Sequence, residues 1–490
     1  MANFLAHKRP HLPKLSALCI GLVLATAAYA QTDTAAVWRA TSRLGYGPTP
    51  QIIKAASDDP KAWATQQIEA AYTASQSLAK VPQEDARILA PIQAVVRDYQ
   101  IERESRKVLR EQAKTPSSGA GGAAIGSPVG AMRPDPSPEP EKFSREMGQS
   151  AASWSLTSCS NPDIENPLLA RMTEFWFNHL NVFVGKGTVR PFVGSYLLSV
   201  IRPHALGKFE DLLLASAKHT AMLFYLDQAQ SNNRGLNENY ARELMELHTL
   251  GVNSGYSQND VRELARILTG WTVPVAQGEG FRFADRLHDK DTKTLLGVSY
   301  NNRGVQEGED AIRFLARQPA TAARISARIA SFFVADKPPE VLVNRMTKTF
   351  LSSQGDIRAV MRTLVESQEF WAAENQLFKT PRDFVCSALT AAGGVREKRD
   401  IGQSLVFLSQ AGQAMHGWQT PDGYKTDAAT WLAPEALTRR ADFALGIAGR
   451  IQEPVFLLPF LDNATRERIT RENTPLRTGL MLASPGFMRK

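Results

Sequence analysis

Apolar side chains recur every three to four residues along most of the chain, which is the spacing of one buried helical face. The residues VRELARIL at 261–268 are an example, and Ser257 and Asp260 before them have the spacing of a helix-capping box. Runs of the same kind predict helices over residues 36–44, 49–71, 84–114, 167–180, 205–219, 237–250, 261–269, 319–334, 339–351, 356–367 and 381–392. The pattern therefore predicts a mostly α protein with a large multi-helix domain.

One stretch alternates in the manner of a β-strand. Phe281 and Phe283 alternate with polar residues, and residues 295–298 are apolar enough to return as a partner strand. We expect a small β-ribbon near residues 281–300. No repeat of fixed period occurs, which argues against a solenoid.

A change of composition divides the chain. Residues 116–130 read PSSGAGGAAIGSPVG and residues 134–141 read PDPSPEPE, which are typical of flexible and extended linkers. We interpret residues 115–142 as a disordered linker or insertion, the alternative being a covering lid. It separates an N-terminal helical segment, residues 31–114, from a main helical domain, residues 143–490.

The first 30 residues have the pattern of a signal peptide. A basic start with Lys8, Arg9 and Lys14 precedes an apolar run at 15–27, and Ala28-Tyr29-Ala30 fits a cleavage site. The run is short for a bilayer anchor, although an uncleaved anchor is the alternative. We therefore expect export to the periplasm or the outside, with cleavage near Ala30 and no membrane span afterwards. The Sec and twin-arginine routes both stay open.

Charge and cysteine content narrow the functional classes. Cleavage removes three basic residues and lowers the net charge from +8 to +5, and no basic cluster with interleaved aromatic residues points to a nucleic acid. The mature chain keeps Cys159 and Cys386, which either pair or stay as two free buried thiols.

The most polar predicted helix is NENYARELMELHTLG at residues 237–251. Asn239, Glu243 and Glu246 are spaced i, i+4, i+7, so their oxygens share one stripe that suits a hard cation or a carboxyl acting as general acid or base. Arg242 lies beside this stripe and could neutralise it in an ion-pair network. A solvent-exposed polar face is the simpler interpretation.

Histidines add further candidates. His248 and His179 both fall on the apolar sides of their predicted helices, where a hydrogen-bonded core histidine is more common than a ligand. His288 and Asp289 follow the expected strand, close to Lys293, where a loop can present a base or ligand. Surface His-Asp pairs are common, so a structural role is the alternative.

Several kinds of chemistry lack their motifs. The sequence has no nucleophile elbow, phosphate-binding loop, dinucleotide fingerprint, c-type haem attachment or closely spaced zinc ligands. We therefore expect no nucleotide and no c-type haem. A divalent metal ion stays open as a cofactor, with ligands drawn from separate helices.

Eight segments resemble the bacterial family called domain of unknown function 1800. They are SRLGYGPTP (42–50), EFWFNHLNV (174–182), IRPHALGKFEDLLL (201–214), GLNENYARELMELHTLGV (235–252), YSQNDVRELARILTGW (256–271), HDKDTKTLLG (288–297), FKTPRDFV (378–385) and DGYKTDAATWL (422–432). The resemblance implies an exported, mainly helical bacterial protein without an established activity. It also implies an exported partner protein encoded nearby, but it assigns no catalytic residue.

Two functional hypotheses follow. The first is a helical binding or assembly protein that acts with an exported partner, its polar residues forming buried networks. The second is a metal-assisted envelope enzyme, a hydrolase or oxidoreductase. Its catalytic candidates are Glu243, Glu246, His248, His288 and Asp289, and its binding candidates are Asn239, Arg242, His179 and Lys293. The second requires the acidic stripe and the histidines to share one cavity.

Overall fold

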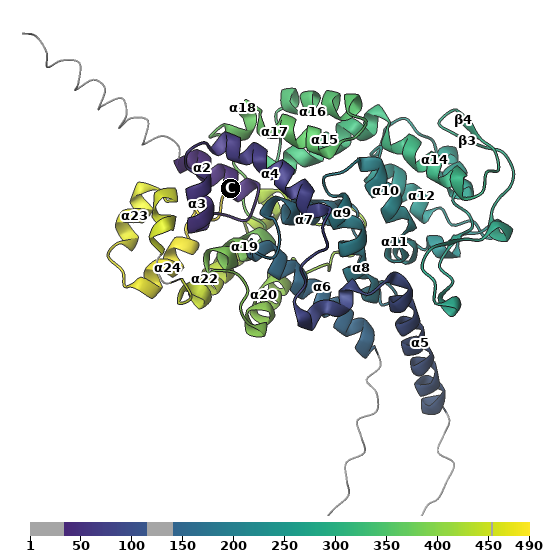
Figure 1. The fold of residues 1–490 in the computed structure, drawn as a ribbon, viewed down its shortest axis with the longest axis horizontal. Coiled ribbons are helices and arrows are strands. Elements are labelled where there is room, and N and C mark those ends of the chain that lie inside the picture. Colours follow the sequence, from purple (N-terminus) through teal and green to yellow (C-terminus); the bar gives the residue numbers. More distant parts are fainter. Residues whose placement is uncertain (1–33, 115–140, 452–453) are drawn as a thin grey trace, which may run out of the picture.

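The computed structural model describes residues 34–114, 141–451 and 454–490 (Figure 1). Helices predominate in these residues, with two two-stranded antiparallel sheets, which confirms the predicted mostly α class. The signal peptide expected at residues 1–30 and positions 115–140 of the expected linker lie outside the described residues. No helix in the described ranges is long and apolar enough to cross a membrane.

The N-terminal helices pack against the rest of the chain. They are α2 (Thr34–Arg43), α3 (Pro50–Ala56), α4 (Pro60–Ser75), the 3-10 helix η1 (Gln83–Leu89) and α5 (Ile92–Lys114). The helix expected at 49–71 is divided between α3 and α4 because Asp59 caps a new helix and Pro60 occupies its first turn. One apolar core contains residues from Val37 to Phe370, whereas the far end of α5 projects from the body (Figure 1).

The middle of the chain forms the bulk of this core. Its helices are α6 (Lys142–Ser160), α7 (Pro167–His179), η2 (Arg190–Phe192), α8 (Val193–Tyr196), the π-turn η3 (Leu197–Ile201), α9 (Arg202–His204), α10 (Phe209–Lys218), α11 (Thr220–Tyr225), η4 (Gln228–Gln230), α12 (Asn239–Glu243), the π-turn η5 (Leu244–His248), α13 (Gln258–Ile267), η6 (Val275–Gln277), η7 (Asp285–Leu287), α14 (Val305–Ala316), α15 (Pro319–Phe333), α16 (Glu340–Ser352), α17 (Ile357–Val365) and α18 (Gln368–Trp371). The capping box predicted at Ser257 and Asp260 is present at the start of α13. Local capping therefore sets this helix boundary as expected.

The C-terminal helices surround a second, smaller apolar core. They are α19 (Pro381–Ala391), α20 (Lys398–Gln410), α21 (Ala428–Trp431), α22 (Pro434–Ala448), η8 (Pro454–Phe460), α23 (Asn463–Ile469) and α24 (Thr474–Leu482). A disulfide between Cys159 and Cys386 joins α6 to α19. Of the two states considered for these cysteines, the structure therefore contains the paired one.

Three of the four strands in the described residues lie within 281–300, where a β-ribbon was expected, but β1 lies before this range and the predicted pairing is wrong. Strand β2 (Arg282–Phe283) pairs with β1 (Trp271–Thr272), and β3 (Lys293–Leu295) pairs with β4 (Val298–Tyr300). Leu296 and Gly297 have positive φ angles of 49° and 80° and form the tight turn of the second hairpin. Such a two-residue turn joins adjacent strands, so residues 295–298 fold back on themselves and do not pair with residues 281–283.

Candidate functional site

The polar segment at 237–251 is not a regular α-helix. After α12, residues 244–248 form the π-turn η5, and the Thr249 hydroxyl donates to the Leu244 carbonyl at 2.6 Å. A wheel drawn at 100° per residue is therefore wrong for the last turn. Single π-turns occur frequently at functional sites, so this segment remains of interest.

The predicted acidic stripe lies at the surface. Asn239 is exposed, whereas Glu243 and Glu246 are half-buried. Arg242 forms ion pairs with Glu238 at 3.2 Å and with Glu246 at 3.7 Å, as the network interpretation expected. Burial, followed by repulsion from Glu246, raises the pKa of Glu243. Among the described residues, no hydrogen bond or ion pair joins Glu243 or Glu246 to an imidazole.

His179 and His248 point inward, as expected, and lie together. Each side chain is 1 % exposed, their ring centroids are 6.4 Å apart, and the Nε2 atom of His179 is 3.1 Å from the His248 carbonyl oxygen. Burial, followed by the charges of Arg324 and Arg328, lowers the pKa of His248 to about 3. Both rings are therefore neutral core groups at neutral pH, because burial also lowers the pKa of His179.

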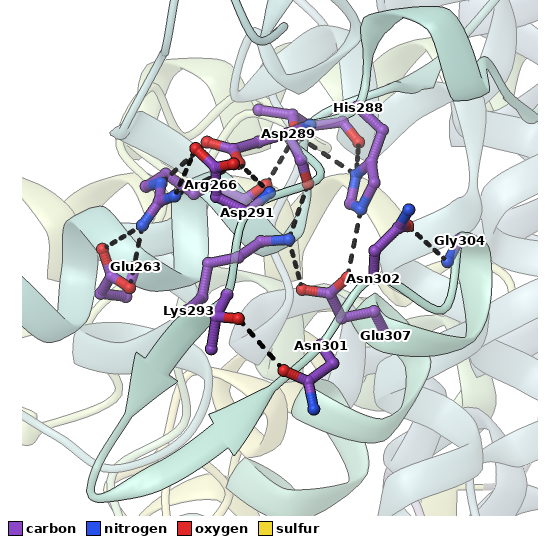
Figure 2. A network of polar contacts seen from close by, with 12 residues as sticks. Glu263, Arg266, His288, Asp289, Asp291, Lys293, Asn301, Asn302, Gly304 and Glu307 are labelled. Atoms are coloured by element: carbon purple, nitrogen blue, oxygen red, sulfur yellow. Dashed lines mark hydrogen bonds and ion pairs between the residues drawn. The ribbon is translucent and has the colours of Figure 1, made fainter.

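His288 and Lys293 belong to a second, separate network (Figure 2). The Nε2 atom of His288 lies 3.1 Å from Glu307, and Lys293 lies 2.7 Å from the other oxygen of the same carboxylate. All three side chains are at most 1 % exposed. Asp289 turns away and pairs with Arg266 at 2.8 Å, so the partner of His288 is Glu307 on α14 and not its neighbour in sequence.

The nine candidate residues thus fall into three places: the surface stripe, the His179–His248 pair and the His288–Glu307 network. Within the described residues, no group of three or more His, Cys, Asp or Glu side chains is arranged to hold a metal ion. The candidate ligands therefore do not fit a shared metal centre.

A different group of side chains lines a small cavity of about 30 Å³. Its walls come from α7, from the start of α19 and from residues 413–426, and none of the lining residues is exposed. The polar lining includes Glu174, Arg382, Gln413 and His416, beside the rings of Phe177 and Phe332 and other side chains. A space of this size holds about two water molecules.

His416 is the most unusual residue of this cavity. Its backbone has a φ of 54°, in the left-handed region that residues other than glycine seldom occupy, although Asn, Asp and His are enriched there. Its Nε2 atom lies 3.2 Å from the Ser155 hydroxyl, while its buried Nδ1 atom has no hydrogen-bond partner among the described residues. Burial, followed by the charge of Arg382, lowers the pKa of His416 to about 3, so the ring is neutral at pH 7.

Glu174 connects the cavity to a buried charge network. Its Oε2 atom accepts a hydrogen bond from the Tyr46 hydroxyl at 2.5 Å and an ion pair from Arg171 at 3.1 Å. Arg171 also pairs with Asp383, the residue that completes the capping box of α19. Arg382 lies 3.8 Å from the Oε1 atom of Glu174, and its buried Nε atom lacks a hydrogen-bond partner among the described residues.

Residues 412–427 close the cavity by docking on the end of α7. Asn178 donates to the Tyr424 carbonyl at 2.9 Å and accepts from the Tyr424 amide at 2.7 Å. Asn181 donates to the Trp418 carbonyl at 3.0 Å. Gly423 approaches so closely that an added Cβ would lie 2.0 Å from the Asn178 carbonyl oxygen, so this contact requires glycine.

Sequence reasoning based on helix faces and histidines missed this cavity. A usable signal was present, because the segments at 174–182, 378–385 and 422–432 that carry the family resemblance all contribute to it. The first of these segments lies about 200 residues before the second, so periodicity within one helix could not bring them together.

A larger hollow lies at the surface between α20 and α22. It has a volume of about 630 Å³, and Phe407 and Phe443 lie on its floor with ring centroids 4.9 Å apart. Val406 beside them is 56 % exposed, and the charged lining consists of Arg399, Arg439 and Arg450 together with Asp400 and Asp442. We call this hollow the α20–α22 groove.

Comparison with known proteins assigns nearly the whole chain to one family. No curated protein and no solved structure matches the chain. The model of one family matches residues 39–489, a range that includes the core helices, the cavity and the groove. The protein therefore belongs to the family described as "Protein of unknown function (DUF1800)".

Proposed function

We propose that the protein is an exported helical protein that binds an exported partner, and that the α20–α22 groove is the surface it uses. The supporting observation is a partly exposed apolar lining beside two exposed arginines, Arg399 and Arg439, that have no carboxylate partner among the described residues. Phe443 is half-buried and Val406 is 56 % exposed. In the part of the chain that the structure describes, neither Arg399 nor Arg439 has a carboxylate within ion-pair distance.

Two glycines lie in the lining of the groove. An added Cβ on Gly402 of α20 or on Gly446 of α22 would meet no atom within 4 Å. Glycine in a helix costs up to about 1 kcal/mol relative to alanine, and here no packing contact requires it. A partner helix with apolar side chains could occupy the open space, and acidic residues flanking them could pair with Arg399 and Arg439, whereas Asp400 of the lining already pairs with Arg450.

The metal-assisted enzyme hypothesis has weaker support. Its candidate residues lie in three separate places, and the buried ones are enclosed by other side chains. Buried networks of this kind stabilise one packing arrangement without chemistry.

The proposal of export rests on the composition of residues 1–30. N-terminal sequencing of the mature protein tests it, and the sequence should begin near Gln31.

Site-specific photo-crosslinking in the native organism tests the partner proposal. A photoreactive residue at Val406 should give one discrete adduct whose second component, identified by mass spectrometry, is another exported protein. The matched control is Val341 on α16, which is 63 % exposed but far from the groove in the sequence. The adduct should disappear in an Arg399→Glu/Arg439→Glu variant. Equal labelling at both positions, or no adduct at Val406, would refute the proposal.

A further inference from the structure

We propose that the cavity at His416 binds a small planar oxyanion that carries a proton, with hydrogencarbonate as the representative ligand. Its charged oxygen accepts a hydrogen bond from Arg382 Nε, and its hydroxyl group donates to His416 Nδ1. This site is separate from the α20–α22 groove, and the inference does not depend on the proposed partner.

The hydrogen bonds around Ser155 determine which nitrogen of His416 carries the proton. The Ser155 hydroxyl donates to the Ala151 carbonyl oxygen at 2.9 Å. With its single proton used in this way, the hydroxyl accepts from the Nε2–H group of His416, 3.2 Å away, and we assign the ring this tautomer. The Nδ1 atom is left with its lone pair, buried and without a partner among the described residues. Since a buried acceptor without a donor is costly, the ligand should bring a hydrogen-bond donor to this atom.

The free donor of Arg382 favours a negatively charged ligand. Arg171 and Lys490 pair with Asp383, and Arg171 and Arg382 share Glu174. The Nε atom of Arg382 lies 3.8 Å from Glu174 Oε1, within ion-pair distance but too far for a hydrogen bond, so its N–H group has no acceptor among the described residues. A buried N–H donor without an acceptor is costly, and a charged oxygen is the strongest acceptor for a guanidinium group.

The volume of the cavity limits the size of the ligand. About 30 Å³ corresponds to about two water molecules. A planar ion of four heavy atoms is near the upper limit, and the flat rings of Phe177 and Phe332 line the space. Sugars, nucleotides and peptides are too large for the cavity as it stands.

The backbone contacts of His416 help to hold the ring in this position. The residue has a left-handed φ of 54°, and its carbonyl accepts a hydrogen bond from the Val184 amide at 3.0 Å. Uncommon backbone conformations of this kind cluster at ligand sites. The conformation of His416 therefore agrees with the assignment made from its unpaired nitrogen.

Hydrogencarbonate and nitrate give a matched test of the proposal. The two ions are planar, singly charged and similar in size, but nitrate has no proton to donate to His416. In protein with ¹⁵N-labelled histidine at mildly alkaline pH and constant ionic strength, hydrogencarbonate should shift the His416 Nδ1 resonance in a saturable manner. It should also raise the melting temperature, whereas nitrate should do neither.

Variants test the two contacts separately. Arg382→Gln should weaken hydrogencarbonate binding roughly 10- to 100-fold, the effect of losing one charged hydrogen bond. His416→Asn keeps a residue that tolerates the left-handed backbone and should abolish the preference over nitrate. Circular dichroism checks that each variant folds. If a variant does not fold, the comparison of the two ions on the unaltered protein tests the proposal by itself. Equal effects of both ions, or no effect of either, would overturn the proposal.

Discussion

The buried imidazole of His248 should make the stability of the protein depend on pH. Burial lowers its pKa from 6.5 to about 3, and Arg324 and Arg328 add to the effect. Below pH 6.5 an unfolded chain binds a proton at this residue, whereas the folded protein does not until the pH approaches 3. The stability contributed by the neutral ring is therefore complete above pH 6.5 and is lost as the pH falls toward 3.

The size of this effect follows from the two pKa values. Below pH 6.5 the free energy of unfolding falls by about 1.4 kcal/mol for each pH unit because of this one proton. Between pH 7 and pH 5, His248 should thus lower the free energy of unfolding by about 2 kcal/mol. This is a large part of a typical stability of about 5–15 kcal/mol.

Urea unfolding at pH 7 and pH 5 measures the effect. The variant His248→Asn replaces the titrating ring, so its loss of stability between the two pH values should be about 2 kcal/mol smaller than that of the unaltered protein. The control is Leu244→Ala, another fully buried position in the same π-turn without a titrating group. It should be less stable at both pH values but keep the full pH difference. If His248→Asn keeps that difference too, His248 is not the neutral buried group described above.

Three further outcomes are expected. Replacing Cys159 and Cys386 by serine removes a disulfide between residues that are 227 positions apart. In the chain-entropy model, the free energy of unfolding should fall by up to about 5 kcal/mol. Denaturant titration with and without reductant measures this loss, and identical curves would contradict it. Gly423→Ala forces a Cβ against the Asn178 carbonyl, so the free energy of unfolding should fall by at least about 1–2 kcal/mol. Residues 412–427 should also become sensitive to limited proteolysis. Unchanged resistance to the protease would argue against the docked arrangement. Gly402→Ala meets no neighbour and should raise the free energy of unfolding by about 0.5–1 kcal/mol; a destabilised variant would show that the glycine has a packing role.

The helices were largely predictable because their signals are local. The capping box at Ser257 and Asp260 and the proline at the start of α7 mark boundaries that the structure reproduces. The break before Pro60 was missed, because the apolar pattern continues across it while Asp59 starts a new helix. The π-turn at 244–248 was also missed, since its extra residue per turn leaves no clear mark in the spacing of side chains.

The pairing of the strands could not be predicted from the local sequence pattern. The alternation near Phe283 correctly indicated extended backbone, but it contains no information about the partner. The partner, Trp271, lies on a strand that a nine-residue connection, residues 273–281, separates from the strand of Phe283. The apolar residues at 295–298 instead close a hairpin, because positive φ angles at Leu296 and Gly297 turn the chain back at once.

For the polar residues, too, burial was predictable from the sequence, whereas distant partners were not. Amphipathic spacing correctly placed His179 and His248 in the interior, and it allowed for Arg242 as the ion-pair partner of Glu246. It did not reveal Glu307 as the partner of His288. It also missed the cavity at His416, whose walls come from distant parts of the chain.

The sequence by itself determined the helical class, many of the helix boundaries and which faces turn inward, because these depend on side chains within a few residues of one another. Only the tertiary structure decided that Cys159 pairs with Cys386, that Tyr424 docks on Asn178, and that His416 lines a small cavity. Those contacts join residues more than 200 positions apart. They form only when whole helices pack, and the periodicity of one helix does not specify which neighbour its buried face will meet.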